Sequence, residues 1–235
     1  PLISLLNMTA GDTHVIKAKE TTFIKTGRHI HRKEPLLKAV QTDGELKNTK
    51  PLPDPKYAYS NLTSDILFNY IMHKVGKDFD SFITRFYQDK VRIKYPVYLS
   101  MNDVSPNWKK PTTESRILQG AGQYSIFATR YDYLRIGKAI LDDWQNDTCV
   151  GEYLKTIYDR SVPMGQNRKW RKGRTYDPDF QSVATQYAGQ FYSRFPGLLQ
   201  QKVIALSGKD GQQIVINLDR GRIVVISAGQ EGKYS

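Results

Sequence analysis

The last part of the chain contains three short segments that are rich in valine and isoleucine. They cover residues 202–206, 213–218 and 222–228. Branched side chains of this kind favour extended backbone, because they pack well on a pleated surface. The sequence Asp219-Arg220-Gly221 joins the last two segments and is typical of a hairpin turn. The sequence therefore predicts that the chain ends in antiparallel β-strands.

Helical patterns precede these strands. Apolar residues recur at helical spacing after Asn61, with Gly76 as a C-terminal stop, at Ile66, Leu67, Tyr70, Ile71 and Val75. A second amphipathic helix is predicted to present one face made of Phe79, Phe82, Ile83 and Phe86. Residues 2–8 have the spacing of a short helix. We therefore expect an α+β fold, with a mostly helical region at 57–175 and antiparallel strands within 183–235.

Thr129 and Asp132 have the spacing of a capping box, which predicts that a further helix begins there. The buried face of this helix is predicted to contain Tyr133, Leu134, Gly137, Ile140, Leu141 and Trp144. Residues 13–56 are polar and basic and end in KPLPDPK, where three prolines disfavour regular structure. We expect that stretch to form a large surface excursion.

The composition is typical of a globular protein. Hydrophobic residues make up 39% of the 235 positions, and the longest apolar runs, such as IVVISA, are too short to cross a bilayer. The start of the chain has no signal-peptide pattern and no initiator Met, so we expect it to be the middle of a domain. The single cysteine, Cys149, excludes an internal disulfide and is interpreted as a small hydrophobic residue near a helix end.

The net charge of +12 makes a nucleic-acid ligand a possible interpretation. The densest basic cluster is NRKWRKGR at 167–174, where five basic residues surround Trp170. Such a cluster could bind phosphates and stack a base, or it could be a solvated loop of a basic protein. No nucleic-acid-binding motif accompanies it, so nucleic-acid binding is kept as the less favoured alternative.

Two groups of polar residues could carry chemistry. Tyr59 and Asn61 stand two positions apart at the beginning of a predicted helix, and Lys209 follows a predicted strand. A lysine near a tyrosine favours the phenolate and lowers the tyrosine pKa, which suits a general base. Gly211 would allow the Gln212 N–H to point into a cleft as an oxyanion donor.

The order of several segments resembles the serine β-lactamase and penicillin-binding-protein superfamily, particularly its class C β-lactamase, DD-peptidase and esterase branch. LLNMTAGD at 5–12 is similar to the "LLxHTSG" segment of that branch, and YAYSN at 57–61 to its Tyr-x-Asn block. GAGQYSIFATRYDYLRIGKAIL resembles the "aGGlysTarDlarfg" segment. YAGQFY followed by SGKDGQQIVINLDRGRIVVIS resembles the closing block with its Lys- or His-x-Gly triplet. The resemblance covers almost the whole chain and implies an incomplete β-lactamase-like domain over 1–235.

The resemblance implies a role for each matching residue. Tyr59 would act as the general base and later protonate the leaving group. Asn61 would hydrogen-bond the substrate amide, and Lys209 would place positive charge beside the tyrosine. Asp210, Gly211 and Gln212 would line the substrate position, and Gln212 would supply one oxyanion-hole N–H. The reaction needs no cofactor and no metal.

The family also requires a nucleophilic serine in a Ser-x-x-Lys segment upstream of LLNMTAGD. The one Ser or Thr that is followed three residues later by Lys is Thr22, which lies on the wrong side of that landmark. Lys25-Thr26-Gly27 spells a third motif but precedes Tyr59, so its order is wrong. We therefore expect the nucleophile in a segment outside this sequence. The alternative is a non-catalytic relative that binds acyl or peptidoglycan-like ligands.

Asp210 stands where the family usually has threonine, near the position that meets the carboxylate of a β-lactam. An aspartate would repel that carboxylate, so we expect an esterase or amidase acting on a neutral or cationic small-molecule or peptide-like substrate. By analogy with the family, the location would be the bacterial periplasm or cell envelope. The sequence leaves the natural substrate and the oligomeric state open.

Other polar patterns are weaker. His29 and His31, with His14 as a further candidate, could bind a metal, but the neighbouring arginines and lysine would repel a cation, so no metal site is predicted. The acidic pairs Asp142-Asp143 and Asp177-x-Asp179 are interpreted as a helix end and a loop rather than as catalytic carboxylates.

Overall fold

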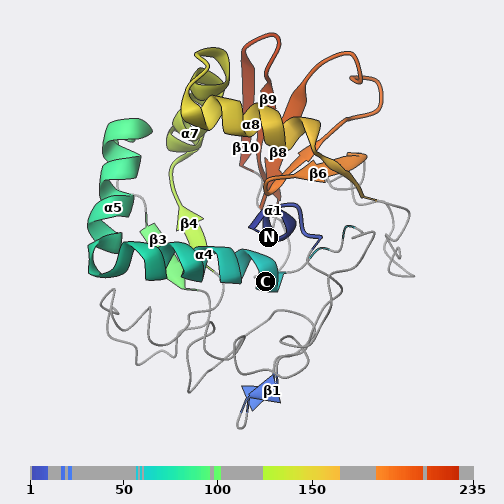
Figure 1. Cartoon of the computed structure of the whole chain (residues 1–235). Coiled ribbons are helices and arrows are strands. Elements are labelled where there is room, and N and C mark those ends of the chain that lie inside the picture. Colours follow the sequence, from blue (N-terminus) through green and yellow to red (C-terminus); the bar gives the residue numbers. More distant parts are fainter. Residues whose placement is uncertain are drawn as a thin grey trace, which may run out of the picture. The chain divides into compact units, whose positions relative to one another are not determined.

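The computed structural model describes residues 2–9, 17–18, 21–22, 57, 59, 61–95, 98–101, 124–164, 184–208 and 211–227. The chain divides into two compact units (Figure 1). The first comprises Pro1–Lys90 and Pro96–Phe127, and the second comprises Val91–Tyr95 and Ala128–Ser235. Each unit is described by itself below.

The described elements of the first unit are mainly helical. Its helices are α1 (Leu2–Leu6), α4 (Asn61–Val75), the 3₁₀ helix η1 (Gly76–Asp78), α5 (Phe79–Arg85) and the π-helix η2 (Phe86–Lys90). Its short strands are β1 (Lys17–Ala18), β2 (Thr21–Thr22), β3 (Tyr98–Met101) and β4 (Tyr124–Phe127), paired antiparallel as β1–β2 and β3–β4. The helix predicted after Asn61 is confirmed, and Gly76, with φ of +65°, follows its last residue.

The second predicted helix is confirmed only in part. Phe79 is fully buried, and its ring meets that of Phe68 edge to face at 5.5 Å. Phe82 and Phe86, however, are exposed, and Tyr87 is buried instead. The chain changes from α- to π-helical geometry at Phe86, and the wider turn shifts the inward direction by one residue. The prediction of a single apolar face was therefore wrong at Phe82 and at Phe86, and the π-helical turn accounts for Phe86 only.

The described part of the second unit contains a six-stranded antiparallel sheet and two helices. The strands are β5 (Val162–Pro163), β6 (Gln186–Ala188), β7 (Phe191–Ser193), β8 (Val203–Ser207), β9 (Gln212–Asn217) and β10 (Arg222–Ser227). Their order in the sheet is β10-β9-β8-β7-β6-β5, so strands that follow one another in sequence are neighbours in space. Figure 1 shows α7 (Arg130–Gln145) and α8 (Cys149–Asp159) beside this sheet. The α+β expectation and the three C-terminal strands are confirmed.

Helix α7 packs closely on the last two strands. A Cβ atom added to Gly137 would lie 2.9 Å from Cγ2 of Ile223 and 3.0 Å from Cγ2 of Ile214. Ile214 and Ile216 face inward from β9 and are buried. Glycine at position 137 therefore allows the helix to approach the sheet.

Two hairpin turns fix the register of the strands. Gly221, with φ of +63°, lies in the predicted turn between β9 and β10, where the Arg220 N–H donates to Oδ1 of Asn217 at 3.0 Å. Between β6 and β7, Gly189 and Gln190 both have positive φ, of +55° and +72°. Two such residues form the turn whose twist matches that of antiparallel strands.

The predicted beginning of α7 is confirmed. The Thr129 hydroxyl oxygen accepts the Asp132 N–H at 3.2 Å, and the hydroxyl donates to Oδ2 of Asp132 at 2.9 Å. The predicted buried face is shorter than expected: Gly137 and Leu141 are buried, but Leu134 is 42% exposed. Helical spacing gives the direction of a side chain, but not how far along the helix a packing surface extends.

Among the described helices, none has the length and apolar character needed to span a membrane.

Candidate functional site

The first half of the candidate site lies at the beginning of α4. Asn61 is the first residue of this helix, and Tyr59 lies two residues before it. The Tyr59 side chain is 54% exposed, so its phenol can meet a ligand in solution. The placement of the Tyr-x-Asn triplet at a helix beginning is therefore confirmed.

The second half lies where β8 turns into β9. β8 ends at Ser207 and β9 begins at Gln212, and the Gly208 N–H donates to the Gln212 carbonyl at 2.7 Å. Lys209 and Asp210 lie outside the described residues. Gly211 has φ of +90°, a conformation that residues with a Cβ rarely adopt. The predicted strand before Lys209 is confirmed. Gly211 adopts a left-handed backbone conformation, and its role in the reaction stays a prediction.

The two halves belong to different units. Tyr59 and Asn61 are in the first unit, and Gly211 and Gln212 are in the second. Within the second unit, the Gln212 side chain lies against Gly208: its Oε1 would be 3.4 Å from a Cβ added there. That Tyr59 and Lys209 act together stays a prediction.

Two further hydroxyl groups of the second unit are buried and not available to a substrate. The Tyr158 hydroxyl and the Ser193 Oγ have no hydrogen-bond partner within the described part of the chain. Burial raises the pKa of Tyr158, while the guanidinium of Arg194, 4.8 Å from its ring, acts in the opposite direction. Neither side chain is solvent-exposed, so neither is a candidate nucleophile.

The acidic pair at the end of α7 has structural roles, as predicted. Asp143 is buried and accepts the Thr148 hydroxyl at 2.8 Å, just before α8 begins. Asp142 is half-exposed and pairs with Lys138. Cys149 is the first residue of α8, so its position at a helix end is confirmed, but its side chain is exposed rather than packed as a small hydrophobic residue. Position 149 starts a helix beside a turn, where no core surrounds it.

Of the other residues that could carry chemistry, some lie in the part of the chain that the structure describes and others lie outside it. His73 is exposed on α4. The histidines at 14, 29 and 31, the basic stretch 167–174 and the acidic pair at 177 and 179 lie outside the described residues, as do Thr26 and Gly27. In the described ranges, no group of three His, Cys, Asp or Glu residues could hold a metal ion.

A buried carboxylate at the beginning of α7 holds two segments of the second unit together. Oδ1 of Asp132 accepts the Lys94 backbone N–H at 3.0 Å and pairs with Nη1 of Arg135 at 2.8 Å. The Asp132 side chain is completely buried. Burial raises its pKa, but the hydrogen bonds from Lys94, Thr129 and Arg135 together outweigh burial and hold the pKa below its usual value of 3.8. The capping pattern revealed Asp132 as a helix start, but not its contact with residue 94.

We expect Asp132→Asn to destabilise the protein at neutral pH by about 2–4 kcal/mol. The substitution replaces the buried carboxylate, which accepts hydrogen bonds from three donors, with a neutral amide. Since folding lowers the pKa of Asp132, its stabilisation is present above pH 3.8 and is lost as the pH falls through the folded-state pKa. The variant should lack this part of the acid dependence. Urea unfolding between neutral and acid pH measures both effects.

The matched control is Asp142→Asn, which removes an exposed ion pair on the same helix. Its effect on the free energy of unfolding should be within about 1 kcal/mol. Equal losses for the two variants would show that the Asp132 network does not stabilise the unit as proposed.

Comparisons of the chain with protein-family models, with curated proteins and with solved structures gave no match.

Proposed function

We propose that this chain is part of a serine hydrolase related to the β-lactamases and penicillin-binding proteins. It would cleave an amide or ester through an acyl-enzyme, with the nucleophilic serine in a segment outside these 235 residues. The observation that carries the proposal is the β8–β9 connection: β8 ends at Ser207, two residues before Lys209, and Gly211 adopts a left-handed φ of +90° next to Gln212. The exposed Tyr59 at the beginning of α4 supports it.

The proposed mechanism uses these residues in two half-reactions. Tyr59 would act as a phenolate, favoured by the positive charge of Lys209 as the resemblance implies, and would take the serine proton while the serine oxygen attacks the substrate carbonyl. The Gln212 N–H stabilises the oxyanion, and Tyr59 then protonates the leaving amine or alcohol. Water attacks the acyl-enzyme in the second half-reaction, Tyr59 accepts its proton, and the proton returns to the departing serine oxygen. Asn61 would orient the substrate amide.

The sequence of the connection also bears on the substrate. An aspartate at position 210 would disfavour substrates with a carboxylate at that place. The substrate class that fits is therefore a neutral or cationic amide or ester, small or peptide-like. A location at the bacterial cell envelope belongs to the same proposal, since it follows from the resemblance.

The proposal is tested by incubating the native protein, with all the segments that it carries in its cells, with a fluorophosphonate probe. The serine oxygen would bond to phosphorus and release fluoride. We expect one adduct by intact mass, and peptide mapping should place it on a serine followed three residues later by lysine. A heat-denatured sample is the control and should stay unlabelled.

If the native protein acquires no adduct, or if the adduct maps to an exposed serine without such a lysine, the hydrolase proposal is wrong. Tyr59 and Asn61 would then belong to a binding protein without catalysis.

A further inference from the structure

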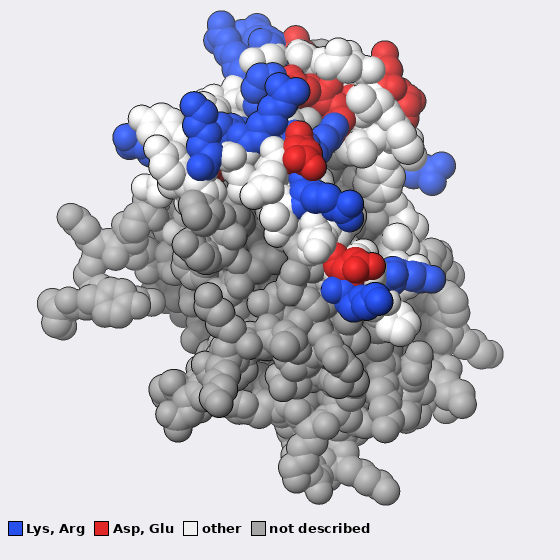
Figure 2. Space-filling model, turned by 90° about the vertical axis from the view of Figure 1, so that its left-hand side faces the viewer, with Lys and Arg blue, Asp and Glu red and all other residues white. Residues whose placement is uncertain are grey.

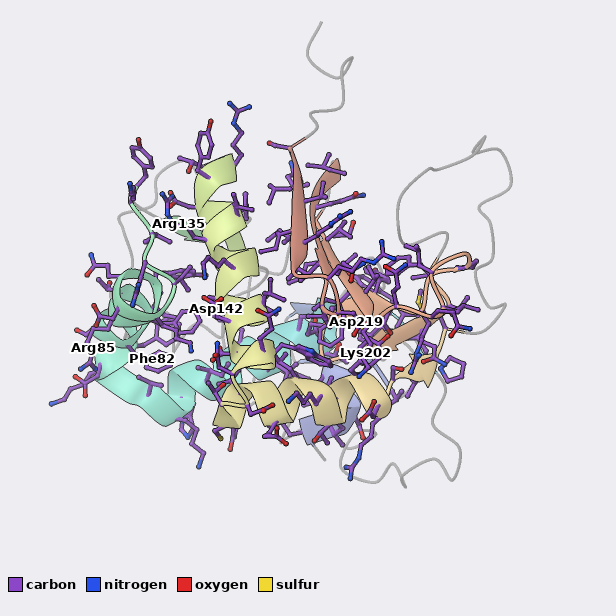
Figure 3. The ribbon with its side chains drawn as sticks, turned by 90° about the horizontal axis from the view of Figure 1, so that it is seen from above. Phe82, Arg85, Arg135, Asp142, Lys202 and Asp219 are labelled. Atoms are coloured by element: carbon purple, nitrogen blue, oxygen red, sulfur yellow. The ribbon has the colours of Figure 1, made fainter. Side chains whose placement is uncertain are left out.

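The second unit brings together two charged segments through a contact between residues 38 positions apart in sequence. The Lys94 N–H donates to Oδ1 of Asp132 at 3.0 Å, which holds residues 91–95 against the first turn of α7. Neighbouring Cα atoms are about 3.8 Å apart, so residues within two positions of this contact lie close to it. Figure 3 shows Arg135, which pairs with the same carboxylate, near the beginning of α7.

The side chains around this contact are basic or aromatic, and they face solvent. The Arg–Tyr surface, as we name it, consists of Arg92, Lys94, Tyr95, Arg130 and Tyr131. Tyr95 is 54% exposed and Tyr131 is 57% exposed, although both are large aromatic residues. The Arg130 guanidinium lies 5.1 Å from the centre of the Tyr131 ring, so a cation and a ring are already arranged together.

The positive charge of this surface is not neutralised locally. Among the described residues, no ion pair involves Arg92, Lys94 or Arg130. The one carboxylate in residues 91–95 and 128–138 is Asp132, which is completely buried and pairs with Arg135. Figure 2, which views the molecule from the left-hand side of Figure 1, shows Lys and Arg side chains over the described part of that face, with some Asp and Glu side chains among them. An anionic partner would complement the charge of this surface.

We propose that the Arg–Tyr surface binds single-stranded nucleic acid. Cations that follow a phosphate backbone, together with exposed rings on which bases stack, are the two components of sequence-tolerant single-strand binding. An anionic membrane fits less well, because a helix that lies in a membrane surface needs a broad apolar face. The exposed side of α7 near the contact offers only Leu134, among Arg130, Tyr131 and Lys138.

The binding test uses fluorescein-labelled oligothymidylate of about twelve nucleotides, with anisotropy measured in about 50–200 mM salt. Three unpaired cations predict a slope of log K against log salt of about −2. Replacing both tyrosines, Tyr95→Ala with Tyr131→Ala, should weaken binding by about 5- to 100-fold for each ring. Phenylalanine at both positions keeps the rings and should restore the affinity.

A second pair of variants tests the charges. Arg92→Gln with Lys94→Gln should reduce the slope to about −0.7, since one unpaired cation remains. The matched control is Arg220→Gln with Arg222→Gln, two exposed arginines where β10 begins, beside the other end of α7. This control should leave the affinity and the slope unchanged, and circular dichroism should show that all variants are folded.

Three outcomes would overturn the proposal. The first is the absence of salt-dependent binding to the oligonucleotide. The second is equal competition by base-free polyphosphate together with no effect of the alanine variants, which would mean that the bases are not recognised. The third is binding to vesicles that contain anionic lipid but not to the oligonucleotide, which would identify a membrane surface instead. None of these results depends on the hydrolase activity, so the two proposals fail or stand separately.

Discussion

Replacing Tyr59 by phenylalanine is expected to lower kcat/KM for hydrolysis of a p-nitrophenyl ester by about 10²- to 10⁴-fold, the usual contribution of a general base. The change removes one hydroxyl group from a side chain that is 54% exposed at the beginning of α4. Because the ring stays and little of it is buried, the free energy of unfolding should change by less than about 0.5 kcal/mol. Steady-state kinetics and urea unfolding of the native-length protein measure the two quantities.

Tyr153→Phe is the matched control for this prediction. Tyr153 is 46% exposed on α8, in the other unit, and has no role in the proposed reaction. Its kcat/KM should equal that of the unaltered protein. A Tyr59→Phe enzyme with the same activity as this control would remove Tyr59 from the mechanism. If the Tyr59→Phe variant loses stability as well as activity, Tyr59 has a structural role.

Replacing Gly151 by alanine is expected to destabilise the protein by roughly 3 kcal/mol, or to prevent the second unit from folding. Gly151 is buried in the first turn of α8, and an added Cβ would lie 1.9 Å from the backbone oxygen of Asp143. No contact between non-bonded heavy atoms can be that short, so the α7–α8 connection would have to move. The Gly151 N–H donates to the Thr148 hydroxyl oxygen at the beginning of α8, and the Thr148 hydroxyl donates to Oδ1 of Asp143. The shift would therefore disturb both hydrogen bonds.

Gly208→Ala serves as the control, because a Cβ at that position would meet its nearest atom, Oε1 of Gln212, at 3.4 Å, an ordinary contact. Its free energy of unfolding should change by less than about 1 kcal/mol. Urea unfolding followed by circular dichroism compares the two variants. Equal stability of Gly151→Ala and Gly208→Ala would show that α7 and α8 are not held in this arrangement.

The secondary structure could be predicted largely from local patterns. β8, β9 and β10 begin and end within a residue or so of the predicted strands, and the turn at Gly221 is where the sequence places it. α7 begins directly after Thr129, as the capping pattern requires. These features depend on residues that are neighbours in sequence, since backbone preference, side-chain alternation and capping all act over a few positions.

The candidate site could be predicted only in its local parts. The sequence places Tyr59 at a helix beginning and Gly211 at a turn, and the structure agrees. The sequence cannot give the distance from Tyr59 to Lys209, because the two residues are 150 positions apart and no local pattern links them. Their joint action therefore stays a prediction that kinetics can test.

The sequence by itself determined the α+β class, the C-terminal strands and the points where α4 and α7 begin. Only the tertiary structure decided that Asp132 is buried against the Lys94 backbone and that Gly151 lies against Asp143. The physical reason is the range of the forces involved. Local preferences act within a turn or a strand, whereas burial and charge pairing depend on which distant segments the packing of the core brings into contact.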